Sequence, residues 1–321
     1  MNFTIGFERE DVTKLHAYWD EIITTQHWSE GKFTRLFEER WSHHNQLGAV
    51  AFSSWSGGAL AALEYFDVKG HTVLCPSNTF IATPLSVITA GGNVEFVDCN
   101  RNDLCMSLDD LEKKIAKHSP RAVWLVHIGG HIAFQVEMIA RVCHDRGIIL
   151  LEDCAHAHGA SWNGKRPGSW GDAGVYSFFA TKTVSTGEGG MLVTKDSGLV
   201  EFAKQYRNYG KPDFRVLGLN HRMSEFTAAI GCLQANRLDE IVAWKNEYAK
   251  TELDPRYVAR LTVPSGMVSG YYKYVVFEPI ERSTGKVYDQ PCHKLLGRKD
   301  VLPNSEWASG NHWCVPLYYK G

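Results

Sequence analysis

The chain has 321 residues, of which 44% are hydrophobic and 22% charged, with a formal net charge of −2. This composition is typical of a globular protein with a large core, and the length favours about two domains. The near-neutral charge gives no basic surface for nucleic acid or an anionic membrane, and no apolar run approaches the roughly 20 residues that span a bilayer.

Apolar runs alternate with helix-length segments through the first part of the chain. Predicted strands cover residues 49–52, 72–75, 94–97, 121–127, 147–153, 172–178 and 191–194. Predicted helices cover residues 57–66, 79–90, 108–117 and 136–146, with Ser107 as the N-cap of the third. This alternation indicates an α/β protein whose mostly parallel sheet is covered by helices on both faces.

The rest of the chain is predicted to be organised differently. One long helix is expected over 223–250, because this stretch has few breakers and apolar residues at helical spacing. Residues 251–321 contain short strand-like pieces, such as 272–277, and predict a smaller α+β unit. We therefore divide the chain into a large domain over 1–245, which includes an N-terminal segment, and a small domain over 246–321.

Cysteines and histidines are numerous but do not form a familiar metal motif. The eight cysteines include no C-x-x-C pair, so we expect reduced, mostly buried thiols. Cys154, His156 and His158 alternate, with His127 and His131 upstream, yet no compact set of four ligands emerges and we expect no metal. The amino terminus has no basic segment followed by an apolar one, so we expect no signal peptide and a cytoplasmic location.

Two residues late in the predicted sheet carry chemistry. Asp153 ends a buried strand, and Lys182 follows the next strand in the run Ser177-Phe-Phe-Ala-Thr-Lys182. Ligands of open α/β sheets bind at the carboxyl ends of strands, and a desolvated lysine there has a lowered pKa and an amine free for Schiff-base chemistry. Taken singly, Lys182 is better interpreted as a solvated surface charge, and Asp153 as a helix cap or turn residue.

The surrounding motifs resemble those of the DegT-type (DegT/DnrJ/StrS) sugar aminotransferases. The resemblance rests on segments 76–83, 152–160, 168–172, 177–190 and 218–225, and it extends from about residue 33 to about residue 248. It implies a fold-type I aminotransferase that uses pyridoxal 5'-phosphate (PLP) and acts on nucleotide-linked keto-sugars.

The resemblance also implies roles for single residues. Lys182 would hold the PLP aldehyde as a Schiff base, and Asp153 would pair with the pyridinium nitrogen. His156 corresponds to a residue near the phenolic oxygen, and Phe80 to the aromatic residue that stacks on the ring. A core histidine and a core phenylalanine are the competing interpretations of these two. The role of Glu188 stays open.

The phosphate is expected at the start of a helix. Ser56, Gly57 and Ser177 correspond to phosphate-binding positions, although the family usually has Gly-Thr where this chain has Ser56-Gly57. Asn220 corresponds to an asparagine that reaches the phosphate of a partner subunit, which implies a homodimer with shared sites. Its alternative role is an N-cap for the long helix.

The resulting hypothesis is transamination of a nucleotide-linked keto-deoxysugar, with glutamate as the amino donor. A PLP sugar dehydratase is one rival, which Lys182 opposes because those relatives carry histidine at this position. A non-catalytic regulatory protein is the other, because residues after about 250 look contracted and the small domain shortened. For the same reason a more open acceptor site is expected. His293, His312 and Trp313 are the polar and aromatic groups left near its rim, although their favoured interpretation is as packing residues.

Overall fold

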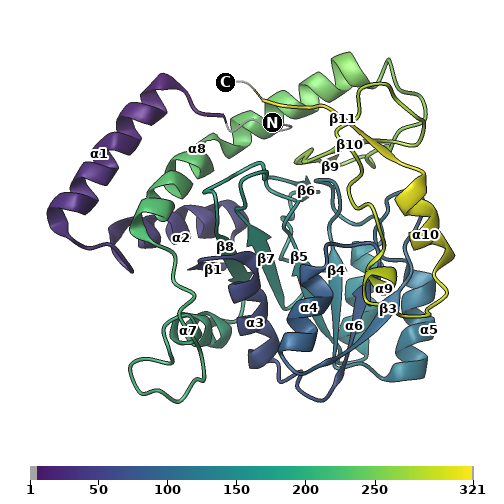
Figure 1. Ribbon diagram of the computed structural model, residues 1–321, viewed down its shortest axis with the longest axis horizontal. Helices are drawn as coiled ribbons and strands as arrows, with labels where there is room; N and C mark the ends of the chain where they lie inside the picture. The colour runs from purple at the N-terminus through teal and green to yellow at the C-terminus, as the bar shows by residue number, and fades with distance from the viewer. Residues whose placement is uncertain (1–5, 320–321) are drawn as a thin grey trace.

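A seven-stranded sheet forms the centre of the large domain (Figure 1), in a computed structural model that describes residues 6–319. The strand order is β1-β8-β7-β5-β4-β2-β3. Strand β8 is antiparallel to both its neighbours, and the other neighbouring pairs are parallel. The strands are β1 (Gly48–Phe52), β2 (Thr72–Pro76), β3 (Asn93–Val97), β4 (Ala122–Val126), β5 (Ile149–Asp153), β7 (Ala173–Ser177) and β8 (Gly190–Thr194). Their near-continuous apolar sequences fit strands that are buried on both faces.

Helices cover both faces of this sheet, and each face has its own apolar core. Apolar residues of α3, α4 and α7 pack in one core, and those of α5 and α6 pack in another. The bounds are α3 (Trp55–Tyr65), α4 (Ala82–Thr89), α5 (Leu108–His118), α6 (Val136–Asp145) and α7 (Ser197–Tyr206). Ser107 is the N-cap of α5, and its hydroxyl accepts a hydrogen bond from the Asp110 amide, as predicted. The α/β fold expected from the alternating pattern is confirmed.

The long helix α8 (Glu225–Tyr248) continues into a short π-helical turn, Ala249–Leu253. Its N-cap is Ser224, whose hydroxyl accepts a hydrogen bond from the Thr227 amide at 3.2 Å. The alternative role of Asn220 as the N-cap of this helix is therefore wrong. The N-cap lies four residues after Asn220.

Two N-terminal helices pack on α8, and the sequence analysis did not predict them. These are α1 (Arg9–Thr25) and α2 (Lys32–Asn45). Phe33, Phe37 and Trp41 of α2 lie in one buried core with α8. The fully buried Glu225 carboxylate accepts hydrogen bonds from the backbone amides at the start of α2, so the first turn of α8 also caps α2.

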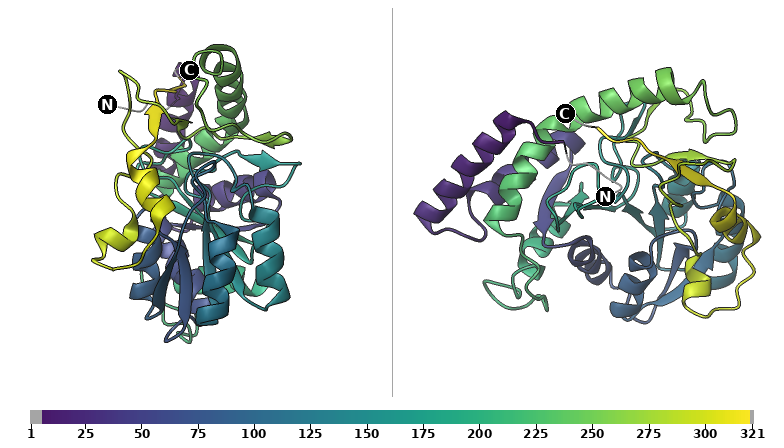
Figure 2. Two further views of the ribbon diagram at one scale, coloured as in Figure 1. Left: turned by 90° about the vertical axis from the view of Figure 1, so that its right-hand side faces the viewer. Right: turned by 45° about the horizontal axis from the view of Figure 1, so that its top comes forward.

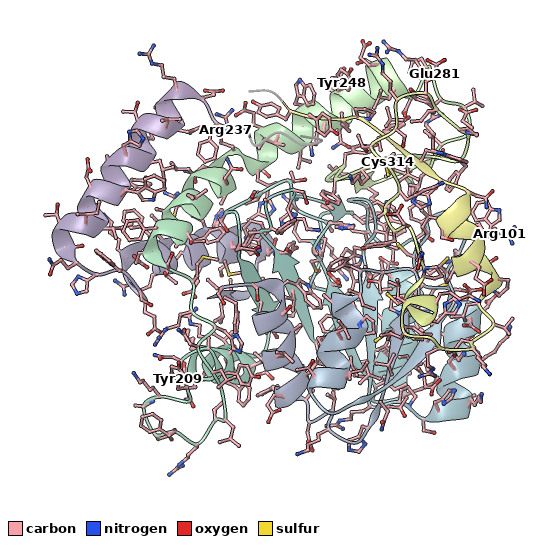
Figure 3. The ribbon with its side chains drawn as sticks, in the orientation of Figure 1. Arg101, Tyr209, Arg237, Tyr248, Glu281 and Cys314 are labelled. Carbon is pink, nitrogen blue, oxygen red and sulfur yellow. The ribbon has the colours of Figure 1, made fainter. Side chains whose placement is uncertain are left out.

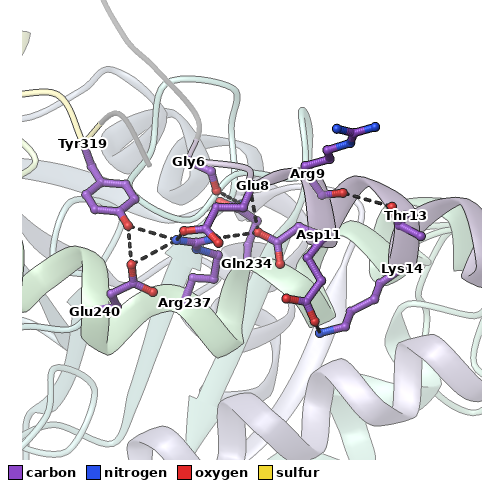
Figure 4. Close-up of polar contacts among 11 residues, drawn as sticks. Gly6, Glu8, Arg9, Asp11, Thr13, Lys14, Gln234, Arg237, Glu240 and Tyr319 are labelled. Carbon is purple, nitrogen blue, oxygen red and sulfur yellow. Dashed lines mark hydrogen bonds and ion pairs between the residues drawn. The ribbon is translucent and has the colours of Figure 1, made fainter.

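Arg237 ties residues near both ends of the chain to α8 (Figures 3 and 4). Its guanidinium donates to Glu8 at 2.8 Å and to Asp11 at 2.7 Å. It also donates to the Tyr319 hydroxyl at 2.9 Å and to Glu240 at 3.0 Å. These partners raise the pKa of Arg237 above its ordinary value, with Glu8 the largest influence.

The C-terminal residues, yellow in Figure 2, run down one side of the molecule. Strand β10 lies within the predicted 272–277 segment. The backbone amide of Cys292 donates to the Ser77 carbonyl at 2.7 Å, which attaches α9 to the end of β2. The elements here are β9 (Met267–Val268), which pairs with β6 (Ser161–Trp162), then β10 (Tyr274–Val276), α9 (Cys292–Leu295), α10 (Pro303–Gly310) and β11 (Trp313–Val315). The division at residue 245 stays a prediction.

The eight cysteines are all buried and unpaired, as expected. Among the helices of residues 6–319, none is long and apolar enough to cross a membrane.

Candidate active site

A cavity of about 430 Å³ lies where β5 and β7 end. This is the edge at which open α/β sheets bind ligands. Its wall combines hydroxyls, aromatic rings, carboxylates, a histidine and a lysine. The lining residues are Ser54, Trp55, Ser56, Phe80, Ala82, Asp153, Ala155, His156, Ser177, Phe179, Thr181, Lys182, Glu188, Gly189, Tyr272, Val287 and Tyr288. The cavity thus brings together six of the eight predicted site residues, all except Gly57 and Asn220.

Lys182 lies in a tight turn after β7, where its backbone amide donates to the Phe179 carbonyl at 2.9 Å. Its ammonium lies 4.6 Å from the centroid of the Tyr272 ring. Burial lowers the pKa of Lys182 to about 8; the Asp153 carboxylate opposes this shift, and Lys273 adds to it. The amine is therefore easier to deprotonate near neutral pH than an ordinary lysine.

Asp153 is the last residue of β5, and its carboxylate is held from two sides. The Thr83 hydroxyl donates to Oδ2 at 2.9 Å, and the Ala155 amide donates to Oδ1 at 3.0 Å. Burial raises the pKa of Asp153, whereas these two donors and Lys182 lower it. Thr83 was missed in the sequence, although it lies in one of the matching segments.

His156 is a neutral group that packs against two tyrosine rings. The Gly129 amide approaches Nδ1 at 3.4 Å, which places the ring proton on Nε2. The ring centroid lies 4.3 Å from that of Tyr272 and 5.7 Å from that of Tyr288. Burial lowers the pKa of His156 well below its ordinary value, and Lys182 lowers it further. The site therefore contains a neutral imidazole that can donate a hydrogen bond from Nε2.

Tyr272 is a further site residue that the sequence analysis did not identify. Its hydroxyl forms a hydrogen bond of 3.0 Å with the Thr181 hydroxyl. The Gly129 carbonyl accepts a hydrogen bond from the Lys273 amide at 2.8 Å. The Gly130 carbonyl accepts one from the Gly270 amide at 2.7 Å. Gly130 has φ +106, and a Cβ there would lie 2.4 Å from the Tyr272 nitrogen. A glycine is thus needed for this close approach, which fixes Tyr272 over Lys182.

The start of α3 forms another part of the wall. Ser54 is the N-cap, and its hydroxyl accepts from the Gly57 amide at 3.3 Å. Ser56 is exposed and lines the cavity together with Ser177. Gly57 is buried instead, and a Cβ there would lie 3.0 Å from the Phe52 ring and 3.1 Å from His221. Its small size serves packing at the helix start, where the helix dipole still favours an anion.

Two exposed aromatic side chains and one acid lie at the mouth of the cavity. Phe80 is 61% exposed and Phe179 is 44% exposed, and both line the wall. Phe80 is thus a cavity residue, contrary to the alternative that it belongs to the core. Glu188 is exposed on the same wall.

Asn220 lies in the exposed turn before α8, away from the lining of this cavity. Its side-chain oxygen accepts from the Arg222 amide at 3.3 Å. A role for Asn220 at a phosphate would need a second chain, and it stays a prediction.

His293 and His312 are packing residues, as the favoured interpretation had it, and do not lie at the rim, because both are fully buried. The Ser77 hydroxyl contacts Nδ1 of His293 at 2.6 Å, and Nε2 of His312 accepts from the Val287 amide at 2.8 Å. Both rings fix the C-terminal segment in place. Trp313 is partly buried, and the Lys286 ammonium lies 3.8 Å from one of its rings.

One buried group has donor atoms that could meet a metal ion, namely His127, Glu152 and Cys154. Nε2 of His127 lies 2.8 Å from Glu152, whose carboxylate also accepts from three backbone amides between residues 168 and 171. This group therefore already satisfies its hydrogen bonds and holds the loop after β6. His156 and His158 do not belong to it.

Comparison with known proteins gives a consistent picture. A protein named GDP-perosamine synthase from Escherichia coli O157:H7 is 33% identical over 228 residues, which cover 69% of this chain and 62% of that protein. A "Pleiotropic regulatory protein" from Geobacillus stearothermophilus is 34% identical over 93% of this chain and 88% of its own length.

Solved structures share the whole fold. The aminotransferase TlmJ from Streptoalloteichus hindustanus superimposes with a TM-score of 0.87 at 26% identity, covering 99% of this chain and 93% of that chain. The profile of the DegT/DnrJ/EryC1/StrS aminotransferase family matches residues 10–262. With the cavity and its lysine and carboxylate, this match shows that the chain belongs to the DegT/DnrJ/EryC1/StrS aminotransferase family.

Proposed function

We propose that this protein is a PLP-dependent aminotransferase that transfers an amino group from glutamate to a nucleotide-linked keto-deoxysugar. The observation that carries the proposal is that Lys182 and Asp153 line one cavity, with the start of α3 in the same wall. The Lys182 amine has no hydrogen-bond acceptor among residues 6–319, so it is available to a ligand.

The chemistry of these groups fits that of PLP. Lys182 would hold the aldehyde, and Asp153 the ring nitrogen. Ser56, Ser177 and the start of α3 would hold the phosphate. The ring would lie beside Phe80 and His156. When bound there, PLP supplies an electron sink for the carbon that gains or loses the amino group.

The side chains supply the remaining chemistry. Asp153 keeps the ring nitrogen protonated, because a buried carboxylate stabilises a proton on a neighbouring base. With its pKa of about 8, Lys182 could both accept and return a proton near neutral pH. His156 is neutral, and its Nε2 could donate a hydrogen bond to the bound cofactor. Phe80 and Tyr272 restrict water at the cavity.

The choice of acceptor rests on the relatives. A relative named GDP-perosamine synthase is a protein of nucleotide-sugar metabolism, and we extend that substrate class to this chain. The match spans 62% of that protein, so the sugar, its nucleotide and the aminated carbon stay open. A dehydratase is disfavoured by the lysine at position 182.

A regulatory role is the second candidate, because of the similarity to a protein named "Pleiotropic regulatory protein". Such a protein would retain the cavity and bind PLP without turnover. The two candidates differ in one observable. Only the enzyme regenerates its starting spectrum when a keto-sugar follows the amino donor.

We further propose a homodimer with two shared sites. The loop before α8 exposes apolar side chains, among them Leu217 at 84% and Phe214 at 63% (Figure 3 labels Tyr209, also in this loop). An apolar loop beside Asn220 fits a surface that a second copy covers. Mixing inactive Lys182→Ala with inactive Asn220→Ala protein should partly restore activity, since one of the two heterodimer sites carries neither change. No recovery despite proven subunit exchange would contradict shared sites.

The proposal is tested on the purified protein loaded with PLP. Glutamate should shift the visible absorption of the bound cofactor, and a panel of nucleotide keto-sugars should identify one that reverses the shift. Reversal by one of them supports the aminotransferase. A shift that no keto-sugar reverses, or no shift at all, favours a different acceptor or the regulatory candidate.

A further inference from the structure

A second cavity, of about 130 Å³, adjoins the first. Thr181, Lys182 and Tyr272 line both cavities, so the reactive amine lies at their shared wall. The rest of the small cavity is formed by α8 and the C-terminal segment, which contribute Ile241 and Leu317 among others. Its contents would therefore lie next to the proposed reaction centre.

Three lysines converge on this small cavity, and no acidic residue is found among the described residues that line it. They are Lys182, Lys245 and Lys273. Lys182 and Lys273 lie 4.6 and 5.2 Å from the centroid of the Tyr272 ring. No ion pair joins any of the three to an acid within residues 6–319. Of the three, Lys245 is buried, and a buried ammonium without a countercharge is costly, so an anion beside it would be favoured.

Lys245 is the most deeply buried of the three, with a relative exposure of 6%. Its ammonium donates to the Tyr271 carbonyl at 3.0 Å and to the Thr183 hydroxyl at 3.3 Å. An ammonium has three N–H donors, so one is left without a partner among the described residues. Both partners are neutral, so neither balances the charge of Lys245.

The geometry points to a binding site for a small carboxylate, with Lys245 and Lys273 as its cationic side. The lining of the same cavity also has an apolar part, which includes Ile241, Val315 and Leu317. A carboxylate attached to a short aliphatic chain can contact both the lysines and the apolar residues of this lining, whereas an inorganic anion can use only the lysines. On the proposed function, from which this assignment follows, the occupant is a carboxylate of the amino donor, whose amino group reacts beside Lys182.

The electrostatics agree with this assignment. Burial, together with repulsion from Lys273, lowers the pKa of Lys245 to about 8. Lys273 acts on Lys182 in the same direction. Lys245 nevertheless remains mostly protonated at pH 7, and a bound carboxylate would offset its repulsion by Lys273.

The test compares Lys245→Met and Lys273→Met with the wild-type protein loaded with PLP. Lys250→Met is the matched control, because Lys250 is exposed and lies in the helical turn that continues α8. The readout is the second-order rate at which a donor shifts the cofactor absorbance. Four amines are compared: glutamate, alanine, 4-aminobutyrate and propylamine.

The donors distinguish which carboxylate binds. We expect the rate with glutamate to fall roughly tenfold or more in Lys245→Met, with propylamine and the Lys250→Met control unchanged. A parallel fall with alanine but not 4-aminobutyrate would assign the α-carboxylate, and the reverse would assign the side-chain carboxylate. An equal fall with all four amines would overturn the site, because Lys245 would then act only on the charge of Lys182.

A binding measurement separates this inference from the proposed function. Succinate should raise the thermal unfolding midpoint of the wild-type protein and the Lys250→Met control in a saturable manner, and have a much smaller effect on Lys245→Met and Lys273→Met. If glutamate does not react with the wild-type protein, the proposed function fails while this measurement still tests the site. The absence of a saturable rise in the wild-type protein would overturn the site itself.

Discussion

Replacing Thr83 by valine removes one hydrogen bond from the Asp153 carboxylate and leaves the side-chain shape nearly unchanged. Thr83 is fully buried, and its hydroxyl donates to Asp153 at 2.9 Å. A hydrogen bond to an ionised group contributes about 1.5–3 kcal/mol, and one pKa unit corresponds to about 1.4 kcal/mol. The pKa of Asp153, already raised by burial, should therefore rise by about 1–2 units in Thr83→Val.

The assay is the dissociation constant for PLP, measured by absorbance titration across a pH series. A carboxylate loses its charge as the pH falls through its pKa, and the pairing with the ring nitrogen weakens with it. The pH below which PLP binding weakens should therefore lie about 1–2 units higher in Thr83→Val than in the wild-type protein. Thr89→Val, an exposed threonine of the same helix, should leave it unchanged. A folded Thr83→Val protein with the wild-type pH dependence would refute the reasoning.

Four further outcomes are expected. Lys182→Ala and Lys182→Arg should abolish transamination while circular dichroism stays native, and measurable turnover would remove Lys182 from its role. His156→Ala should be milder, since it loses one hydrogen bond of about 0.5–1.5 kcal/mol, so kcat should fall by less than about twentyfold. Glu225→Gln should lower the free energy of unfolding by about 2–4 kcal/mol in denaturant titrations, because backbone amides at the start of α2 lose a charged acceptor. An unchanged free energy of unfolding would contradict the capping role. Burial lowers the pKa of His131 to about 4 and of His158 to about 3. The unfolded chain therefore binds more protons than the folded protein below pH 6.5, and each histidine should lower the free energy of unfolding by about 2 kcal/mol at pH 5. Denaturant titrations at pH 7 and pH 5 measure this difference, and an equal free energy at both would contradict it.

The sequence predicted the sheet well because its strands are buried on both faces. Each of the seven predicted strands overlaps an observed one, since a continuous apolar run between turn residues leaves little alternative. The N-terminal helices were missed, although Phe33, Phe37 and Trp41 follow one another at a spacing of four residues. That spacing is the helical signal that would have found α2.

The site could be predicted only where residues lie in recognisable segments. Asp153 ends β5 and Lys182 lies in the turn after the neighbouring parallel strand β7, so their meeting follows from the parallel sheet. Tyr272 and Lys245 reach the same place from the C-terminal segment and α8, through contacts that no local pattern encodes. The burial of His293 likewise depends on α9 packing against the end of β2, which only the folded chain reveals.

The central claim is that Lys182, among three neighbouring lysines, holds the cofactor. Borohydride reduction of the protein loaded with PLP, followed by peptide mapping, tests it most directly. The account predicts a single phosphopyridoxyl adduct, on the peptide that contains Lys182. An adduct on Lys245 or Lys273 instead, or no adduct on any of the three, would contradict it.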